Sequence, residues 1–419
     1  MAEKFKAVKG TKDILPNDST KWQTLEQTVH EFMNRWGYGE IRTPAFERTE
    51  LFARSVGEES DIVSKQMYTF LDQSKTSLTL KPELTAPVMR AYLEHNLDRG
   101  GALTKIYYID ALFRQERPQK GRLRQFHQFG AEAVGSPHPE QDIEIIALAY
   151  RLMEAVGVAN PRLQLNSIGS KECQQKFRNA LVEFLTPHSS DLSETSRQRL
   201  KTNPMRILDT KDEGEQAILK SAPRILDCLD DPDKDHYDTV KAGLDALGIS
   251  YEQNDFLVRG LDYYGRTTFE ITSDALGAQN ALCGGGRYDD LLEELGGKPT
   301  PAVGFAAGME RILLAISKES ATDSNTTLKV FVISAGKGAG TAALQTAMDL
   351  RSKGVTSDFD TLQRSVKAQM REANRQGATH TVVIGEEELA NGTCQVKNLS
   401  TSEQKSLPFK ELFEHLTAV

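Results

Sequence analysis

The stretch FRQERPQKGRLRQFHQFGAE, from Phe113 to Glu132, predicts two strand segments joined by an arginine-rich hairpin, with Pro118 and Gly121 in its loop. Between positions 114 and 124 five cations stand against the single acid Glu116, which gives a local charge of 5 minus 1, or +4. Planar guanidinium groups that project from a hairpin can clamp phosphate oxygens with two parallel hydrogen bonds. The five cations are Arg114, Arg117, Lys120, Arg122 and Arg124.

A basic hairpin can also be no more than an exposed, solvated turn. Two features favour a binding site for an anion. The acid Glu116 lies among the arginines, and the returning strand carries an aromatic residue followed by hydrogen-bonding side chains. These residues are Phe126, His127, Gln128 and Glu132. The hairpin is therefore the first candidate for a functional site.

The whole chain does not share the positive charge of the hairpin. It has 51 Lys and Arg against 59 Asp and Glu, so its net charge is 51 minus 59, or −8. This balance argues against a protein that coats nucleic acid in general, and any surface that binds a polyanion must be local. At roughly 150 residues per domain, the 419 residues predict two or three domains.

The cysteines and the termini indicate a soluble protein of a reducing compartment, which we expect to be the cytoplasm. The four cysteines lie far apart and form no metal-ligand spacing, so we expect free thiols and no bound metal. The segment Met1 to Gly10 lacks the apolar core of a signal peptide, and the longest apolar run, Ala302 to Met309, is too short to span a membrane.

Positions 1–166 predict an α+β domain built on antiparallel strands. Apolar residues recur at helical spacing in two segments, Trp22–Trp36 and Gln141–Val156. Between them lie three strand-like segments, Ser77–Leu80, Lys105–Ile109 and Gln125–Val134.

Positions 167–248 are charged, helical in pattern and poor in β-branched residues, so they predict an inserted helical module. Six aspartates between positions 227 and 238 predict an acidic, solvated loop within it. Strand character returns in positions 249–320, at Phe256–Val258 and Thr267–Thr272, and a helix is predicted at Gly308–Ile316.

The polar positions 321–327 predict a linker, and positions 328–419 alternate strand and helix, which predicts a small α/β domain. Gly336 to Gly340 mimics a dinucleotide-binding fingerprint, but Thr341 stands in place of the third glycine, so we interpret an ordinary strand-to-helix turn. The predicted elements are Lys329–Ile333, Ala342–Arg351, Ser365–Gln376, Thr379–Ile384 and Phe409–Leu416.

Six motifs, in order along nearly the whole chain, resemble those of the histidyl-tRNA synthetase family of class II aminoacyl-tRNA synthetases. The resemblance implies an antiparallel-sheet catalytic domain, a helical insertion and a C-terminal anticodon-binding α/β domain. It also implies a homodimer with the first motif at its interface. The motifs are GEIRTPAFE (Gly39–Glu47), KPELTA (Lys81–Ala86), the hairpin, LVRGLDYYGRTTFE (Leu257–Glu270), ALCGGGRYD (Ala281–Asp289) and GFAAGMERIL (Gly304–Leu313).

By this resemblance the chain converts histidine and ATP, which is accompanied by Mg²⁺, to histidyl-adenylate and pyrophosphate, and then transfers histidine to its tRNA. Arg114 is expected at the α-phosphate and the amino-acid carboxylate, and Arg259 is the catalytic arginine at the α-phosphate. The resemblance places Glu116 and Phe126 at the adenine and assigns the outer phosphates to Arg122 and Arg311. Arg259 and Arg311 could instead form structural ion pairs.

Selectivity for histidine requires groups that pair with both imidazole nitrogens, because a hydrogen-bonding site rejects analogues better than an apolar one. By resemblance the imidazole partners are Glu132 and Tyr264. The α-amino and carboxylate groups are assigned to Glu83, Thr85 and Gln128, together with Arg114 and Arg259, with Tyr263 and Tyr288 close by. Alternatively, the tyrosines pack in a core and Glu83 is a helix first-turn acid. Gly284–Gly286 either let the backbone lie close against the substrate or form a plain turn.

Four cations at spacings of 3, 4 and 4 predict one basic helix face in the C-terminal domain: Arg364, Lys367, Arg371 and Arg375. A solvated face is the alternative. The resemblance favours contact with tRNA phosphates, as it does for Arg117 and Lys120 of the hairpin. A rival function for the whole chain is that of a non-catalytic paralogue, the regulatory subunit of ATP phosphoribosyltransferase, which shares the catalytic fold.

Overall fold

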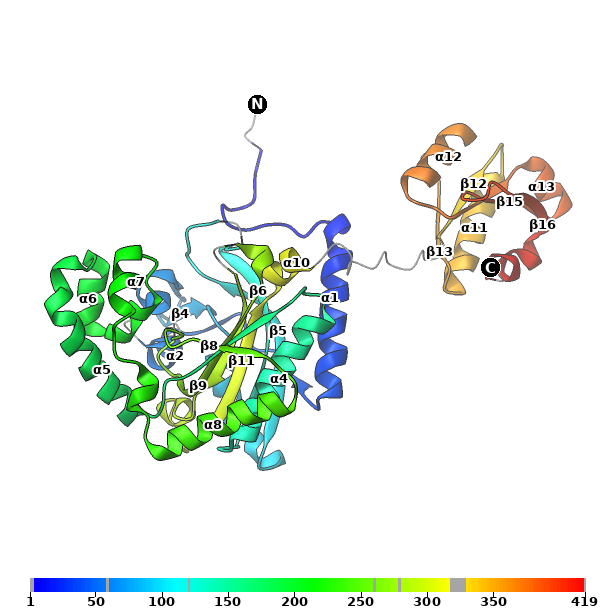
Figure 1. The fold of residues 1–419 in the computed structure, drawn as a ribbon. Coiled ribbons are helices and arrows are strands. Elements are labelled where there is room, and N and C mark those ends of the chain that lie inside the picture. Colours follow the sequence, from blue (N-terminus) through cyan, green and yellow to red (C-terminus); the bar gives the residue numbers. More distant parts are fainter. Residues whose placement is uncertain are drawn as a thin grey trace. The chain divides into compact units, whose positions relative to one another are not determined.

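In a computed structural model of the chain the described residues are 4–57, 60–119, 121–258, 261–277, 280–316 and 329–417. Two of the residues singled out above, Lys120 and Arg259, lie outside them, and so does the predicted linker 321–327. The chain divides into two compact units, Met1–Ser320 and Ala321–Val419 (Figure 1).

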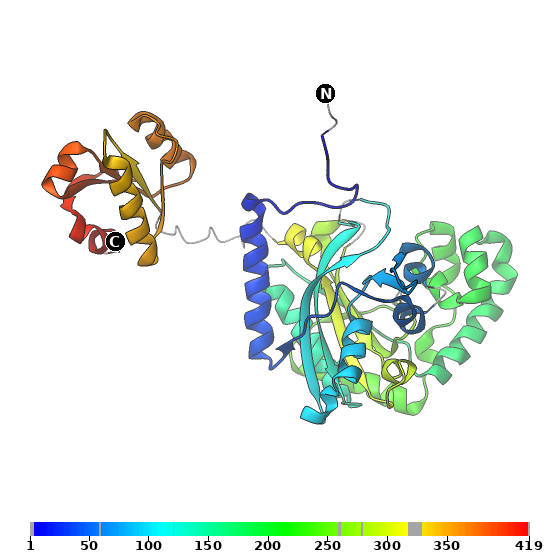
Figure 2. The same cartoon turned by 180° about the vertical axis from the view of Figure 1, so that it is seen from behind.

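An eight-stranded sheet forms the centre of the first unit, and Figure 2 shows it from behind. The sheet is mixed. Its six inner strands are antiparallel, as predicted, but the short edge strands β1 and β8 pair in parallel with their neighbours. The spatial order is β1 (Gly39–Glu40), β5 (Thr104–Phe113), β6 (Gln125–Val134), β11 (Ala302–Gly308), β10 (Ala281–Arg287), β9 (Gly265–Thr272), β7 (Arg162–Ser167) and β8 (Tyr251–Gln253).

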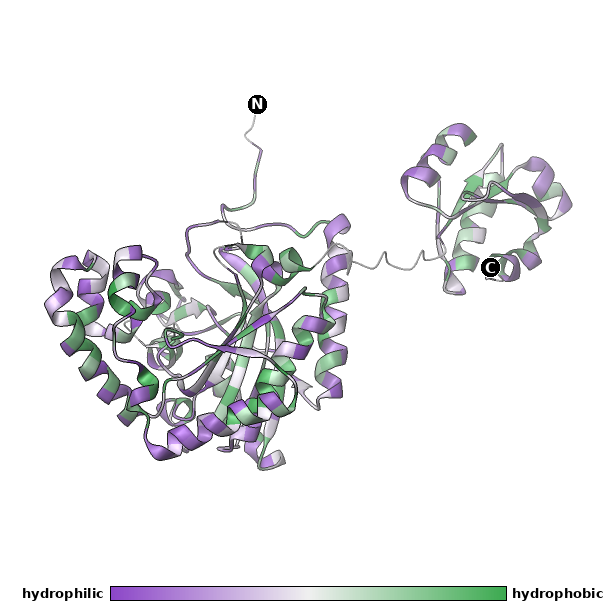
Figure 3. Ribbon diagram, viewed as in Figure 1, coloured by the Kyte–Doolittle hydropathy of each residue, from purple (hydrophilic) through white to green (hydrophobic). Residues whose placement is uncertain are grey.

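The two faces of the sheet bury two different cores, because alternate residues of a strand point to opposite sides. On β5, Tyr107 packs in a core with the helices α1 (Pro16–Arg35), α4 (Pro139–Ala155) and α8 (Asp231–Ala246). The next residue, Tyr108, packs in the second core, with α3 (Thr85–Glu94) and the insertion. Figure 3 shows that apolar residues gather on the strands and on the inner sides of the helices.

The segment between β1 and β5 folds over the sheet as a small subdomain. Its three-stranded sheet, in the order β2-β4-β3, lies beside α2 (Thr49–Val56) and precedes α3. The predicted strand Ser77–Leu80 is β4, and its neighbours are β2 (Phe46–Arg48) and β3 (Tyr68–Leu71).

The inserted module is helical, as its composition predicts. Each of its four α-helices begins with a side chain that accepts a backbone N–H of the first turn, which satisfies part of the free helix end. The capping residues are Ser170 for α5 (Lys171–Leu185), Ser193 for α6 (Glu194–Thr202), Asp212 for α7 (Glu213–Leu219) and Asp230 for α8.

Two expectations for this unit, and one alternative interpretation, are wrong. The aspartates near position 231 begin α8 rather than a loop, and Asp233 is buried against Arg266. Phe256–Val258 forms no strand, because the chain turns after β8. Gly284–Gly286 is no turn but the middle of β10, where a Cβ on Gly285 would lie 2.2 Å from the Gly304 carbonyl oxygen. Only glycine permits this approach of the strands.

The second unit is a five-stranded sheet with helices, and its order is β13-β12-β14-β15-β16. The first three strands are parallel and the last two antiparallel. Its strands are β12 (Lys329–Ser334), β13 (Thr356–Phe359), β14 (His380–Ile384), β15 (Thr393–Asn398) and β16 (Gln404–Pro408). Its α-helices are α11 (Ala339–Ser352), α12 (Val366–Arg375), α13 (Glu386–Asn391) and α14 (Leu412–Thr417).

Sequence patterns predict the buried elements of this unit and miss β13, β15, β16 and α13, which are short and partly exposed. Across both units, none of the described helices combines the length and apolar character needed to cross a membrane.

Candidate functional site

Two adjoining cavities form one cleft on the face of the sheet above β6, β10 and β11. Their volumes are about 690 and 1210 Å³. We call the first the hairpin chamber and the second the tyrosine chamber, after the side chains that line them. The cavities share the lining residues Arg114, Glu116, Arg122, Gln128, Gly284 and Ala306. Residues at this junction can touch ligands in both chambers at once.

The hairpin arises because β5 and β6 pair along their full length and then diverge. The Arg114 N–H donates to the Arg124 carbonyl at 2.9 Å, and beyond it Gln119 and Arg122 exchange backbone hydrogen bonds of 3.1 and 2.9 Å. Gly121, at the turn, has φ +75°, which favours glycine. This geometry directs Arg114 and Arg122 into the cleft, whereas Arg117 is exposed.

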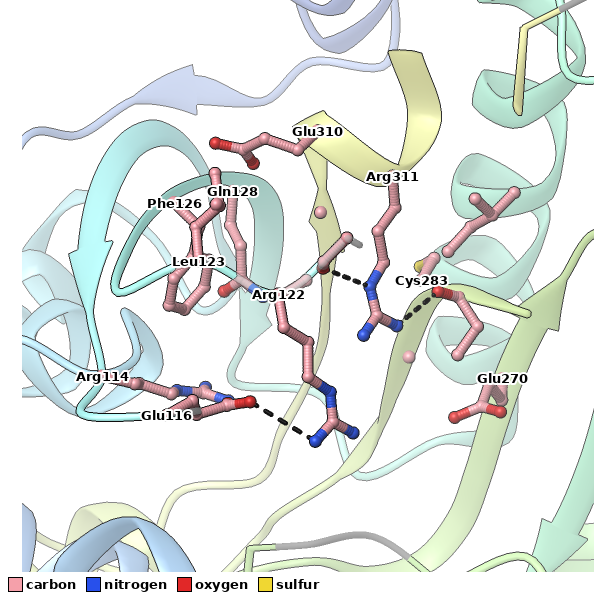
Figure 4. A pocket seen from close by; sticks show the side chains of 16 residues that line it. Arg114, Glu116, Arg122, Leu123, Phe126, Gln128, Glu270, Cys283, Glu310 and Arg311 are labelled. Carbon is pink, nitrogen blue, oxygen red and sulfur yellow. Dashed lines mark hydrogen bonds and ion pairs between the residues drawn. The ribbon is translucent and has the colours of Figure 1, made fainter. Parts of the chain in front are cut away.

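Glu116 organises the arginines of the hairpin chamber. Its carboxylate lies 3.4 Å from Arg122 Nη1 and 3.9 Å from Arg114 Nη1 (Figure 4). Arg114 also donates from Nε to the Pro82 carbonyl at 2.8 Å, and its guanidinium lies 5.2 Å from the centroid of the Phe126 ring. Burial lowers the pKa of Arg114, while the charge of Glu116 opposes that shift. Two cations thus share one acid, although the chamber lining as a whole carries as many glutamates as arginines.

A third cation comes from α10 (Met309–Ala315). Arg311 donates from Nε to the Gly121 carbonyl at 3.2 Å and from Nη1 to the Ala281 carbonyl at 2.9 Å. Burial lowers its pKa, and the charge of Arg122 adds to that shift. Figure 4 shows Arg122 and Arg311 extending into the same space between Glu116 and Glu270. The chamber therefore suits a polyanionic ligand.

His127 lies beside the cleft, and its contacts hold neighbouring elements together. Its backbone N–H lies 3.0 and 3.1 Å from the two carboxylate oxygens of Glu310, and its Nδ1 is 2.9 Å from Glu310 Oε1. The ring meets Trp22 of α1 edge-on at 4.9 Å. These contacts tie β6 to α10 and α1.

In the tyrosine chamber, Glu83 accepts the N–H groups of Thr85 and Ala86 at 2.8 and 2.9 Å, where α3 begins. Glu83 therefore lies just before the helix rather than in its first turn, where the alternative interpretation places it, and its carboxylate also lines the chamber. Burial raises the pKa of Glu83 to about 7, and the two backbone hydrogen bonds act against that rise.

Glu132 lies fully buried beneath the chamber and is not among its lining residues. It accepts hydrogen bonds from Thr85 Oγ1 at 2.9 Å, from the Tyr108 hydroxyl at 3.0 Å and from the Tyr288 hydroxyl. Burial raises the pKa of Glu132 to about 7, and the three hydroxyl donors oppose the rise. An imidazole that reached this carboxylate would meet an acceptor that is already oriented.

Three tyrosines form a cluster at the chamber, and two of them line it. The Tyr263 ring lies 4.7 Å from that of Tyr264 and 5.4 Å from that of Tyr288, measured between centroids. All three are buried, yet Tyr263 and Tyr264 also line the cavity, so they serve in the core and in the chamber wall.

The basic helix face of the second unit differs from its prediction. Arg364 precedes α12 and pairs with Asp360 and, at 3.2 Å, with Glu372. Arg375 also pairs with Glu372, and this arginine lowers the pKa of Glu372 to about 2. Two of the four cations therefore have acidic partners, while Lys367 and Arg371 are exposed on the helix.

Several lining residues have no motif that sequence reasoning could have used. Arg199, Arg206 and Asp209 come from the insertion and line the tyrosine chamber. Glu270 of β9 does belong to a motif, LVRGLDYYGRTTFE, but it lines the hairpin chamber without having been predicted as a site residue. The insertion is held at the tyrosine chamber by ion pairs, from Arg199 to Asp61 at 3.5 Å and from Arg206 to Asp262 at 3.0 Å. These residues could have been found only from contacts between segments far apart in the sequence, which link the insertion to the rest of the unit.

One group in the described part of the chain brings three potential metal-ligand atoms together, from Cys173, Asp230 and Asp233. Each already has a protein partner. Asp233 accepts from Ser170 N at 2.6 Å and from Arg266 Nε at 2.9 Å, Asp230 caps α8, and Cys173 Sγ accepts the Asp230 N–H at 3.3 Å. We interpret the group as helix capping.

Comparisons with known proteins match both units. A family model described as histidyl-tRNA synthetase matches residues 10–312, and one described as an anticodon binding domain matches 329–418. The histidine–tRNA ligase of Thermosynechococcus vestitus is 47% identical over 97% of this chain and 95% of that protein. The ligase of Chloroherpeton thalassium is 48% identical, over 98% and 97%.

Solved structures agree in fold. The apo histidyl-tRNA synthetase of S. aureus is 39% identical, with a TM-score of 0.84 over 99% of this chain and 100% of that one. A Bacillus halodurans structure titled as an ATP phosphoribosyltransferase regulatory subunit/histidyl-tRNA synthetase is 23% identical, with a TM-score of 0.67 over 92% and 99%. The second likeness bears on the fold alone.

Proposed function

The chain belongs to the histidyl-tRNA synthetase family, and on that premise we propose how its cleft joins histidine to tRNA. The protein is a histidine–tRNA ligase that uses ATP. One observation supports the assignment of steps to residues more than any other: a chamber lined by three arginines and a tyrosine chamber meet at Arg114, Glu116 and Gln128.

The first step brings two anions together, because the histidine carboxylate attacks the α-phosphate of ATP. Catalysis then consists of positioning the reactants and offsetting their charge. Arg114 lines both chambers, so its guanidinium can contact the carboxylate and the α-phosphate at once. We assign the same step to Arg259, which lies outside the described residues and whose role follows from the LVRGLDYY motif.

ATP occupies the hairpin chamber in this proposal. Phe126 stacks on the adenine and Glu116 accepts its hydrogen bond, while Arg122 and Arg311 bind the outer phosphates. These four residues line the chamber, which supports the assignment. Mg²⁺ enters with ATP as part of the substrate, and the nearby Glu270 carboxylate suits a hard cation with oxygen ligands.

Histidine occupies the tyrosine chamber. Glu132 and Tyr264 bind the imidazole, and Glu83, Thr85 and Gln128 bind the α-amino and carboxylate groups, with Tyr263 and Tyr288 as the wall. A buried hydrogen-bonding site discriminates because an analogue without the right donors leaves these groups unpaired. The raised pKa of Glu132 near 7 means that its charge, and hence histidine binding, varies with pH in the physiological range.

For tRNA, we propose contacts of the exposed Arg117, and of Lys120 in the same motif, with the acceptor end. The anticodon-binding domain contributes phosphate contacts from Lys367 and Arg371. We assign weaker phosphate contacts to Arg364 and Arg375, because both are paired with Glu372. Lys120 lies outside the described residues. We also propose the cytoplasm as the place of action, where tRNA charging supplies translation.

A homodimer is supported by a groove of about 1680 Å³ along the GEIRTPAFE motif. Ile41, Pro44, Leu51, Leu93 and Leu295 give it apolar walls. Exposed aromatic residues occur on the neighbouring small sheet, where Phe46 and Phe70 meet edge to face at 6.3 Å. Charged residues also line the groove, and apolar side chains and exposed rings on one surface are typical of a surface that a second copy covers.

The domain limits are part of the same proposal. We place the catalytic domain at 1–166 and 249–320, the insertion at 167–248, the linker at 321–327 and the anticodon-binding domain at 328–419.

The rival function, a regulatory subunit of ATP phosphoribosyltransferase, has less support. The chain carries a matched anticodon-binding domain and resembles curated ligases over nearly its full length.

The decisive assay is amino-acid-dependent exchange of labelled pyrophosphate into ATP. We expect exchange with histidine and none with the other amino acids, and a loss of exchange in Arg259→Ala. Absence of histidine-dependent exchange in the intact protein would refute the assignment of the cleft. Full activity in Arg259→Ala would remove only that residue from its role.

A further inference from the structure

The carboxylate of Glu132 is surrounded by more hydroxyl donors than the motifs predict. Thr85 and Tyr108 both donate to Oε1, and Tyr288 donates to Oε2. A carboxylate has about four acceptor positions, so three are occupied and one remains for a ligand. Tyr108 lies in none of the six motifs, and its hydroxyl reaches Glu132 from the neighbouring strand β5.

The backbone leaves room for this arrangement at two glycines. A Cβ on Gly130 of β6 would lie 2.5 Å from the Tyr108 hydroxyl, and a Cβ on Gly304 of β11 would lie 1.6 Å from Glu132 Oε2. Both positions are in the middle of paired strands, where a glycine weakens the sheet unless another group needs the space. Here the occupants of that space are the tyrosine hydroxyl and the carboxylate, together with the Phe305 carbonyl oxygen, 2.2 Å from a Cβ at the Gly130 position, and the Ala131 carbonyl oxygen, 2.6 Å from a Cβ at the Gly304 position.

We propose that Tyr108 is a positioning residue that holds Glu132 as an oriented hydrogen-bond acceptor for the imidazole of histidine. The inference rests on the proposed histidine site. Tyr108 is fully buried and lines neither chamber, so it acts on the substrate only through Glu132.

The physical role of the hydroxyl is to favour the charged form of a buried carboxylate. Burial raises the pKa of Glu132 to about 7, and the donors counter this rise. Without the Tyr108 hydroxyl the pKa rises further. Glu132 is then protonated near neutral pH and becomes a donor where the imidazole N–H needs an acceptor.

Other groups face Glu132 and must be accounted for. Glu83 raises the pKa of Glu132 by its charge, and the tyrosines Tyr38 and Tyr263 feel the charge of Glu132 in turn. Glu83 itself has a pKa of about 7 and titrates in the same range. These groups are present both in the wild type and in a variant that lacks only the Tyr108 hydroxyl. The ratio of KM for histidine in the two proteins therefore reports the effect of the hydroxyl.

The test is Tyr108→Phe, measured as KM for histidine and kcat in pyrophosphate exchange from pH 6 to 8.5. We expect KM for histidine to rise about tenfold at pH 7 relative to wild type, equivalent to about 1.4 kcal/mol. The ratio of KM for histidine in the variant to that in the wild type should increase toward pH 6 and decrease toward pH 8.5. KM for ATP and kcat should stay within about twofold of wild type.

The matched control is Tyr107→Phe, the same substitution one residue earlier on the opposite face of β5. The Tyr107 hydroxyl contacts His30 Nδ1 at 2.8 Å, away from the chamber. This variant should leave KM for histidine unchanged at every pH. If Tyr108→Phe does not fold, Tyr288→Phe removes a second donor from Glu132 and should show the same pH-dependent ratio.

A ratio that is independent of pH, or an equal rise of KM for ATP, would overturn the proposal, because a merely structural defect gives those results. An unchanged KM for histidine in Tyr108→Phe would overturn it as well. Absence of histidine-dependent exchange in the wild type is a different result, which would overturn the proposed function itself.

Discussion

Two regions of the chain are rich in basic residues and have different surroundings. In the hairpin chamber, Arg114 and Arg122 share the single acid Glu116, and Arg311 is held by backbone carbonyls. At α12, Arg364 pairs with Asp360 and Glu372, and Arg375 pairs with Glu372. Guanidinium groups that converge on a cavity can bind a small polyanion, whereas paired cations on an exposed helix bind at most a diffuse phosphate surface.

Whether a cluster of arginines binds a ligand therefore depends on the acidic residues beside it and on whether it lines a cavity or an exposed surface. The hairpin arginines line a cleft and lose part of their hydration, which strengthens their contacts with phosphate. The α12 cations are exposed or partly exposed, where salt screens them. We expect chemistry to depend on the first region and tRNA affinity on the second.

The largest expected effect comes from the junction of the chambers. Arg114→Ala should lower kcat/KM for histidine-dependent pyrophosphate exchange by about 10² to 10³, the usual loss when one preorganised charge donor is removed. The measurement is steady-state exchange with saturating ATP. The matched control is Arg99→Ala, at an exposed arginine that lines neither chamber and should exchange at the wild-type rate. Wild-type activity in Arg114→Ala would contradict the assignment of the chemistry to the cleft arginines.

An intermediate effect is expected at the two exposed cations of α12. Reversal of Lys367 and Arg371 to glutamate should weaken tRNA binding by about tenfold at moderate salt and reduce the slope of log affinity against log salt by about 2. Binding should be followed by filter retention or anisotropy over a range of salt concentrations. The same double variant should keep its exchange activity. Unchanged tRNA affinity and salt slope would remove α12 from the tRNA surface.

A smaller effect is expected where the N-terminal segment supports the hairpin. The Gly10 carbonyl accepts the Arg124 N–H at 2.7 Å, and a Cβ on Gly10 would lie 2.8 Å from Arg124 Cγ and 2.9 Å from Pro118 Cγ. Gly10→Ala should therefore displace the hairpin and raise KM for ATP about fivefold, with KM for histidine less affected.

The control for that experiment is Gly37→Ala, since Gly37 has a similar positive φ and a Cβ added there would meet no atom within 4 Å. It introduces backbone strain without contact with the hairpin. An equal rise of KM for ATP in both variants would show that strain in general, and not the hairpin contact, causes the effect.

The smallest expected effect concerns the acid that pairs the α12 cations. Arg375 lowers the pKa of Glu372 to about 2, below its ordinary value of 4.5. A carboxylate with a lowered pKa stabilises the fold above pH 4.5 and loses this contribution as pH falls toward 2. Glu372→Gln should lower the Tm slightly at neutral pH and less in acid near the lowered pKa, as followed by calorimetry. A larger loss in acid would contradict the pairing.

Much of the fold follows from local patterns. The hairpin strands, the helices of the first unit and the helical insertion are predicted by periodicity, and the structure places β6 at the predicted residues 125–134. The failures have physical causes. Phe256–Val258 has strand-like residues but no neighbour to pair with, and β15 and β16 have mixed polar sequences because they lie toward an edge of their sheet.

The site was predictable only in part. The motifs name residues that the structure brings to one cleft, such as Arg114, Glu116 and Tyr264. No local pattern links Tyr108 to Glu132 or Arg206 to Asp262, because these contacts depend on strand register and on the docking of the insertion. The α12 face was misjudged for the same reason, since pairing with Asp360 depends on the loop before the helix.

The division of labour between the two arginine-rich regions is tested most directly by histidine-dependent pyrophosphate exchange, measured side by side in Arg114→Ala and in the Lys367 and Arg371 reversal. We predict that the first variant loses exchange by about 10² or more, while the second exchanges at the wild-type rate. Equal losses in both variants, or full exchange in both, would contradict the claim that the cleft arginines perform the chemistry and the α12 cations do not.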